Sequence, residues 1–375
     1  MKSIKIIKFT NMKNFKLLIF LLALAQISFA GNDQRIGQAG ASEILINPWG
    51  MSSGLANSNV ASVQGIEAMY QNIAGAAFVK KTEIGFTHTR WLVGSGIGIN
   101  NFGLAQKIGE TGALTIGVTS FSFGDIERTT VANPEGGNGT FNISYTTISL
   151  GYAKAFSNSI YGGFNLKMLS EGISDLSSSG VALDAGIMYR TGVGKNKLGK
   201  KNRDNFKFGI SLKNVGPTMI FRGDGLSFKG TSEGGIPMSI ENRTQDFEMP
   251  TQLIMGLTYD FRIATKVDTV SNKIVSDHIL SVSGAFISNS FTRDQFSLGV
   301  EYSFKNLFQL RGGYLYEKNI YDSATRAIAF TGPSGGATVK IPLNKEAGSY
   351  IGLDYSYRAT ANFDGVHTIG VRVIL

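Results

Sequence analysis

The chain of 375 residues contains no cysteine, only three histidines and only seven prolines. Without cysteine it has no disulfides, thiolate nucleophiles, Cys-ligated zinc sites or iron–sulfur clusters. It also has no cysteine that could carry a lipid anchor at a mature N-terminus. Charged residues make up 17% of the chain, below the roughly 25% usual for soluble globular proteins. The 47 glycines and the 11% of aromatic residues favour a chain of many strands and turns over an ordinary soluble enzyme.

The first thirty residues predict a cleaved secretory signal peptide. Five lysines and no acidic residue precede the apolar run Leu17–Ala25, and the small-x-small sequence SFA follows at 28–30. Because the apolar stretch is at most about 13 residues long and a membrane span needs about 20, a membrane anchor is the less favoured alternative. Translation can start at Met1 or at Met12. Without residues 1–30 the net charge falls from +9 to +4, so the basic balance is partly a targeting feature and no nucleic-acid partner is expected.

After residue 30 no segment holds 18 consecutive apolar residues, so no further transmembrane helix is predicted. Instead, segments of about ten residues alternate between apolar and small or polar side chains. Two architectures produce this pattern. A soluble β-sandwich turns its apolar face to a core, whereas a membrane β-barrel turns it to lipid. The clearest apolar row is Phe296, Leu298, Val300, Tyr302 and Phe304.

Fourteen strands can be placed, and their even number and their length of about ten residues favour a closed antiparallel transmembrane β-barrel over 82–375. The final strand, His367–Leu375, is the kind of chain end that barrel assembly recognises. The predicted strands are 82–91, 97–106, 112–122, 140–155, 159–170, 180–191, 205–214, 249–262, 277–288, 293–304, 307–318, 332–343, 349–359 and 365–375.

The connections separate into long and short ones, as they do in outer-membrane barrels. If the last strand ends at the periplasm, the long external loops are 123–139, 171–179, 215–248 and 319–331. Two periplasmic connections, 192–204 and 263–276, are longer than this pattern predicts. Aromatic residues near the strand ends are either interface girdles or ordinary sheet aromatics: Trp91, Phe121, Phe123, Tyr314, Tyr316, Tyr350 and Tyr357.

Residues 31–81 show no clean alternation and are rich in Gly, Ala, Ser and Asn. Ile66, Met69, Tyr70 and Ile73 recur at helical spacing, so a short helix is expected near 65–74. Small residues allow a segment to pack closely inside a narrow lumen. We therefore predict a partly helical N-terminal plug over 31–81.

Short motifs in this segment resemble the N-terminal signature of the FadL-type outer-membrane proteins. The sequence departs from that signature at Ile73, where proline is usual, and at Ala76, where leucine is usual. The opening stretch 39–48 (AGASEILINP) is closer to the PorV/PorQ branch. The matching stretches are 54–57, 60–61, 67–70 and 72–77, and the plug residues that carry them are Glu67, Tyr70, Asn72, Ala74 and Gly75.

The resemblance implies a 14-stranded, plugged barrel in the bacterial outer membrane, in contact with outer-membrane lipids. It further implies an accessory role in type IX protein secretion. The implied partners are the translocon channel, attachment-complex proteins, partner lipoproteins or the C-terminal domains of secreted cargo. The alternative is a FadL-like transporter of hydrophobic small molecules. A third interpretation, a soluble periplasmic β-protein, predicts extraction without detergent.

The sequence indicates no catalytic constellation, so the protein is not expected to be an enzyme. Each of the three histidines lies an even number of positions from apolar residues of its predicted strand, which places it on the lipid-side face. No partner motif accompanies His88, His278 or His367. No catalytic residue, cofactor or metal site is predicted.

Two stretches are candidate partner contacts. The first is a basic run in 192–204, either a solvated loop or a periplasmic contact for an acidic partner. The second is the loop 215–248, unusually apolar for an exposed segment, which either folds over the lumen or offers a partner surface. The candidate residues are Lys195, Lys197, Lys200, Lys201 and Arg203 in the first, and Phe221, Leu226 and Phe228 in the second.

Overall fold

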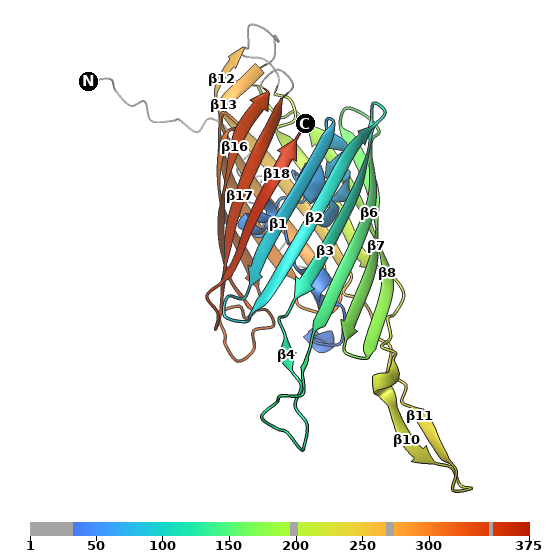
Figure 1. Cartoon of the computed structure of the whole chain (residues 1–375). Helices are drawn as coiled ribbons and strands as arrows, with labels where there is room; N and C mark the ends of the chain where they lie inside the picture. The colour runs from blue at the N-terminus through green and yellow to red at the C-terminus, as the bar shows by residue number, and fades with distance from the viewer. Residues whose placement is uncertain (1–32, 196–201, 268–273, 345–347) are drawn as a thin grey trace.

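The computed structural model describes residues 33–195, 202–267, 274–344 and 348–375. Within these residues, fourteen strands form a closed antiparallel barrel (Figure 1). The predicted fold class is confirmed. The predicted signal peptide lies outside the described residues. The barrel strands are β1 Thr82–Trp91, β2 Ile97–Ile108, β3 Gly112–Ser122, β6 Ile143–Ala155, β7 Ile160–Ile173, β8 Leu176–Thr191, β9 Phe206–Val215, β12 Gln252–Val267, β13 Ile274–Asn289, β14 Gln295–Phe304, β15 Phe308–Glu317, β16 Phe330–Asn344, β17 Ser349–Thr360 and β18 Val366–Ile374.

Each strand pairs with its neighbour in the chain, and the first strand pairs with the last. β1 joins β18 in a register that runs from Glu83 opposite Ile374 to Arg90 opposite His367. Wherever this pairing is complete, the wall has no free strand edge and its backbone groups are hydrogen-bonded.

The barrel is apolar outside and polar inside, the reverse of a soluble barrel. On β8, Val181, Leu183 and Ile187 face outward, and their exposed fractions are 45%, 46% and 59%. Asp184 on the same strand is buried on the inner face. Because water cannot cover so continuous an apolar belt favourably, this outer face fits the hydrocarbon of a bilayer.

Three predicted segments were wrong. The predicted external loop 171–179 is almost entirely strand, because β7 continues to Ile173 and β8 begins at Leu176. Most of 263–276, expected to be a long connection, is strand, because β12 and β13 continue pairing to Val267 and Ile274. The predicted strand 140–155 is broken at Asn142, and its first residues pair with β4 instead.

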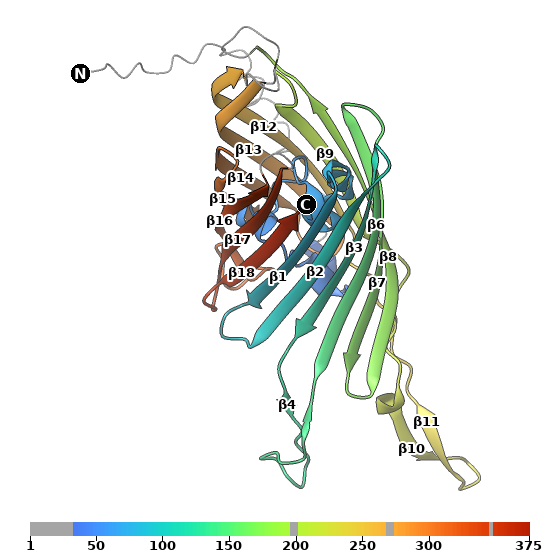
Figure 2. The same ribbon diagram turned by 45° about the horizontal axis from the view of Figure 1, so that its top comes forward.

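Two hairpins project from one end of the barrel, and neither was predicted (Figures 1 and 2). β4 (Ile126–Glu127) pairs with β5 (Thr140–Phe141), and β10 (Ser227–Thr231) pairs with β11 (Pro237–Glu241). A single-turn helix, η6 (Asp224–Leu226), precedes β10. We call this end the hairpin rim and the opposite end, where Leu375 lies, the C-terminal rim.

The segment before β1 consists of short helical turns that lie within the barrel (Figures 1 and 2). Helical turns cover much of the stretch 65–78, including the predicted helix near 65–74. None of the helices in the described part of the chain is long and apolar enough to cross a membrane. The turns of this plug are η2 Asp33–Arg35, η3 Ser42–Leu45, α2 Gly50–Gly54, η4 Gly65–Glu67, α3 Ala68–Gln71 and η5 Ile73–Phe78.

Candidate functional site in the plugged lumen

The plug residues singled out in the sequence attach the plug to itself and to the wall. The side chain of Asn72 accepts a hydrogen bond from the Ala74 amide at 3.2 Å and so caps η5. Its Nδ2 atom also lies within 3.0–3.3 Å of the carbonyl oxygens of Val60, Ile187 and Ile210. One amide therefore joins the plug to β8 and β9 at their paired residues.

Glu67 and Tyr70 make similar fixed contacts. The Ser52 amide donates to Oε1 of Glu67 at 2.5 Å, and the Tyr70 hydroxyl donates to the Ile44 carbonyl at 2.9 Å. Gly75 is required by space, because a Cβ there would collide with the carbonyl oxygen of Val63. Ala74 is fully buried. These motif residues stabilise the plug through hydrogen bonds and close packing rather than form a ligand-binding site.

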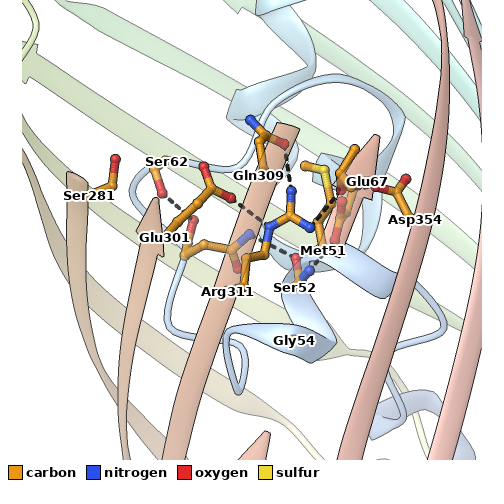
Figure 3. A network of polar contacts seen from close by, with 12 residues as sticks. Met51, Ser52, Gly54, Ser62, Glu67, Ser281, Glu301, Gln309, Arg311 and Asp354 are labelled. Carbon is orange, nitrogen blue, oxygen red and sulfur yellow. Dashed lines mark hydrogen bonds and ion pairs between the residues drawn. The ribbon is translucent and has the colours of Figure 1, made fainter. Parts of the chain in front are cut away.

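A belt of ion pairs lines the lumen beside the plug (Figure 3). At its centre Arg311 donates from Nε to Glu301 and from Nη2 to Gln309, both at 2.6 Å. Next to it Arg372 pairs with Asp354 at 2.9 Å and with Glu83 at 3.8 Å. Pairing of this kind offsets the cost of burying the charges. The belt explains why charged side chains alternate with apolar ones along these strands.

A second group of charges lies on β7, β8 and β9. Lys167 pairs with Asp184 at 2.6 Å and donates to Asn214 at 2.8 Å. Asn214 has a left-handed backbone (φ 60°) at an irregularity in the β8–β9 pairing. Lys213 directly precedes this irregularity in the chain, and its ammonium lies over the ring of Tyr70.

The plug's own titratable groups are shifted by burial. Burial raises the pKa of Glu67, although the charge of Arg372 opposes the shift. Burial, with the charge of Asp184, raises the pKa of Tyr70 well above its usual value. Burial and then the charge of Glu171 raise the pKa of Glu43 to about 8.

The wall is interrupted at the hairpin rim. β9 ends at Val215, opposite Leu183, so the outer part of β8 has no complete partner strand. The chain continues along β8 through the bridge between Ser177 and Arg222. We call this place, between Leu176–Ala182 of β8 and the loop residues beside it, the wall seam.

Apolar side chains from both the loop and the plug fill the wall seam. Met219 and Met249 from the loop are buried there, at 1% and 3% exposure, together with Ile44 of the plug. The ring of Phe247 packs against Gly40, where no side chain fits. The cluster is completed by Ala41, Leu169 and Ala182.

A small pocket adjoins this cluster. Its volume is about 40 Å³, and Ile44 belongs both to the pocket lining and to the cluster at the wall seam. Trp49, Met69, Tyr70 and Phe121 are among its lining residues, beside the charged Glu43 and Lys167. We call it the aromatic pocket.

A larger cavity of about 320 Å³ lies toward the C-terminal rim. Plug residues form one side, and charged wall residues such as Glu301, Lys340 and Arg372 form the other. The two spaces thus differ in chemistry: aromatic side chains line the smaller one beside Glu43 and Lys167, and more charged residues line the larger one.

The candidate partner contacts do not come together. Phe221 is half-buried against Phe247, with ring centres 5.6 Å apart, whereas Phe228 on the projecting hairpin is 46% exposed. Leu226 is half-buried between them. Lys195 and Arg203 are exposed at the C-terminal rim. The remaining candidates, Lys197, Lys200 and Lys201, lie outside the described residues.

The three histidines lie on the outer face, as their parity predicted. Each contacts a neighbouring polar group: His88 an Asn100 oxygen at 2.8 Å, His278 the Tyr302 hydroxyl, and His367 the Tyr355 hydroxyl. Two of the proposed girdle aromatics face the lumen instead. Phe121 is buried in the aromatic pocket, and Tyr350 lines the larger cavity.

Sequence reasoning missed the lumen residues that define the two spaces. Trp49 was not singled out, although a lone tryptophan in a segment rich in small residues is a signal of a packing anchor. Lys340 lies in a predicted strand, and a lysine among apolar outward-facing neighbours indicates a residue of the inner face.

Together, the apolar exterior, the charged lumen and the internal plug define a plugged β-barrel of the outer-membrane class. The chain belongs to the uncharacterised protein family UPF0164, whose family model matches residues 22–302. No curated protein matches the chain.

Several solved barrels are similar in structure at low identity. The toluene transporter TodX of Pseudomonas putida is 12% identical, with 88% of this chain and 97% of that chain covered and a TM-score of 0.49. A FadL homologue of Pseudomonas aeruginosa is 12% identical, with 87% and 98% covered and a TM-score of 0.47. The β domain of the Bordetella autotransporter BrkA is also 12% identical, with 78% and 98% covered and a TM-score of 0.33. Function is therefore inferred from this chain's own side chains.

Proposed function

We propose that this protein takes up small hydrophobic molecules from the outer leaflet and transfers them through the wall seam to the aromatic pocket. The observation that carries the proposal is that Ile44 belongs both to the apolar cluster of Met219 and Met249 at the wall seam and to the lining of the pocket that holds Trp49 and Phe121. Glu43 and Lys167 also line this pocket, so the apolar body of a bound molecule would rest on the aromatic side chains.

On this proposal, the route is closed in the structure. A benzene ring occupies a cavity of about 150 Å³, whereas the aromatic pocket measures about 40 Å³. Entry therefore requires side chains to move, and the unbranched methionines at the wall seam are suited to that role. Phe247, packed on Gly40, and the ion pair of Arg35 with Glu248 at 2.7 Å hold the seam against the plug.

Trp49 offers a direct test. With Trp91 replaced by phenylalanine, Trp49 is the sole tryptophan, because the chain has two. We expect toluene to change its fluorescence saturably in the folded chain. Gly117→Leu, which fills the pocket beside Met69, should abolish the change. Gly312→Leu, at a glycine with open space around it, should not.

A disulfide across the wall seam tests the route. Ser177 and Arg222 form an antiparallel bridge, and such pairs have the spacing a disulfide needs. Because the chain has no cysteine, the double variant Ser177→Cys/Arg222→Cys has no competing thiol. Oxidation should slow the toluene response at least tenfold, and reduction should restore it. An equivalent pair on the β4–β5 hairpin, Ile126→Cys/Phe141→Cys, should show no such effect. An unchanged rate in the locked seam would refute this route.

A second function, binding of protein partners, is favoured by the β10–β11 hairpin. Phe228, Met238 and Ile240 lie on one face of this projecting ribbon and are 46%, 45% and 37% exposed. An isolated two-stranded hairpin is marginally stable in water, so a partner that covers this face would stabilise it. An accessory role in type IX secretion, suggested by the plug motifs, would use such a surface.

This second function predicts a partner that copurifies in detergent and depends on the apolar face. The triple variant Phe228→Ser/Met238→Ser/Ile240→Ser should lose that partner while the barrel remains folded. A matched triple variant on the opposite face, Lys229→Ser/Thr231→Ser/Glu241→Ser, should retain it. Loss of the partner in both variants, or in neither, would remove the hairpin from consideration.

A further inference from the structure

The cavity at the C-terminal rim has an excess of positive charge. Lys207 pairs with Asp260 at 2.7 Å, and the guanidinium groups of Arg311 and Arg372 have carboxylate partners of their own. Among the described residues no carboxylate pairs with Lys80 or Lys340, and both line the cavity. Within the described part of the chain, the acceptor of Lys340 Nζ is the neutral amide oxygen of Asn306, at 2.8 Å.

A third cation lies behind the cavity wall. The guanidinium of Arg190 stacks 3.6 Å from the ring centre of Phe78, which lines the cavity. Arg190 is 7% exposed, and its Nε and Nη2 atoms have no hydrogen-bond partner in the described structure. Buried donors without acceptors are costly, so an acceptor brought into this region would be bound favourably.

The plug also gives the cavity apolar side chains. Leu55, Val63, Phe78 and Val79 line it, beside the polar Asn59, Ser62 and Gln64. A volume of about 320 Å³ is at the lower end of the 300–1,000 Å³ typical of small-molecule sites. The cavity thus combines cationic and apolar side chains and has room for a compact organic molecule.

We propose that this cavity binds a small organic anion, an apolar body carrying a carboxylate or a phosphate group. The oxyanion would face Lys80 and Lys340, and the apolar body would rest on the plug. The site differs from the aromatic pocket in place and in charge, so it does not rest on the proposed transport of hydrophobic molecules.

The test uses three probes with one ring in common. Benzoate and phenyl phosphate carry the two oxyanions, and benzyl alcohol is their neutral counterpart. Calorimetric titration of the full folded chain in neutral detergent should show saturable binding of at least one anion, at least tenfold tighter than benzyl alcohol. The preference between the two anions identifies the oxyanion group.

Variants assign the binding to the cavity. Lys80→Gln/Lys340→Gln should weaken anion binding at least tenfold, whereas Lys80→Arg/Lys340→Arg, which keeps the charge, should stay within about threefold. The matched control is Lys81→Gln/Lys305→Gln, two lysines at the same rim that do not line the cavity. Resistance of the unheated barrel to dodecyl sulfate shows that each variant is folded. Equal binding of benzyl alcohol, an equal loss in the control, or no saturable binding of either anion would each overturn the proposal.

Discussion

The ammonium group of Lys213 lies 3.8 Å from the centre of the Tyr70 ring, so the barrel wall and the plug meet through a cation and an aromatic face. Lys213 is 2% exposed, and none of the described ion pairs includes it. A cation on an aromatic face contributes about 2 kcal/mol or more when both groups are desolvated. Together with the hydrogen bond of Tyr70 to Ile44, this contact makes Tyr70 a principal anchor of the plug.

Substitutions at Tyr70 should separate its two contacts. Tyr70→Phe keeps the ring and loses the hydrogen bond, which should lower the free energy of unfolding by about 1 kcal/mol. Tyr70→Leu also loses the cation–π contact and should cost about 3 kcal/mol. Urea unfolding in lipid vesicles measures both values. Tyr321→Leu, at a side chain that is 75% exposed, is the control and should stay within about 0.5 kcal/mol. Equal losses in the two Tyr70 variants would contradict the role of the ring.

The pair of Glu43 and Glu171 predicts a loss of stability in alkali. Burial, and then the charge of Glu171, raise the pKa of Glu43 in the fold from its usual 4.5 to about 8. Between these values the folded chain holds a proton that the unfolded chain releases, so stability falls as the pH rises through this window. Tyr145 is the other titratable group beside the pair.

Glu43→Gln should remove most of this pH dependence. The melting temperature of the wild type should fall from pH 5 to pH 9, and that of Glu43→Gln should fall less. Glu110→Gln, in the exposed turn after β2, should follow the wild type. A wild type that becomes more stable over this range would show that Glu43 is ionised in the fold.

Gly75 is the position in the plug where an added methyl group should matter most. Its Cβ would collide with the Val63 carbonyl, a backbone atom that cannot move aside. We expect Gly75→Ala to destabilise the chain by about 1–3 kcal/mol, the usual cost of overpacking. Gly312→Ala, on a strand with nothing within 4 Å of the new atom, should be neutral. The measurement is the urea midpoint of unfolding of both variants in the same vesicles. Equal midpoints would contradict the prediction.

Much of the barrel could be predicted because one physical rule repeats along it. Side chains alternate with period two, and the lipid demands an apolar side chain at every second position. The row from Phe296 to Phe304 therefore predicted an outward face, and Leu298 and Val300 are 56% and 44% exposed in the structure. Strand ends were less predictable, because strand pairing continues beyond the apolar rows. There polar residues fit a strand as well as apolar ones do, as at Thr265 opposite Ser276.

The lumen could be predicted only in part. Its small and polar composition follows from parity, and the motif from Glu67 to Gly75 indicated a compact plug. The wall seam could not be predicted, because the early end of β9 depends on the bulge at Asn214, whose left-handed backbone is fixed by Asp184, Lys167 and Pro250 from three other places in the chain. The cavity at the C-terminal rim depends equally on how the plug is seated.

The ion pair of Arg372 with Asp354 should be strongly coupled, because both side chains are about 95% buried beside the plug. Asp354→Leu leaves Glu83, at 3.8 Å, as the remaining ion-pair partner of the guanidinium among the described residues, and should cost about 3–5 kcal/mol. Arg372→Met/Asp354→Leu removes both charges and should be closer to the wild type than Asp354→Leu is. A double-mutant cycle on urea unfolding gives the coupling energy. The same cycle on Arg35 and Glu248, an exposed pair of similar length at 2.7 Å, should give about 0–1 kcal/mol. If the two cycles agreed, water in the lumen would be screening the inner pair as effectively as it screens the outer one, and the belt of charges would not fix the position of the plug.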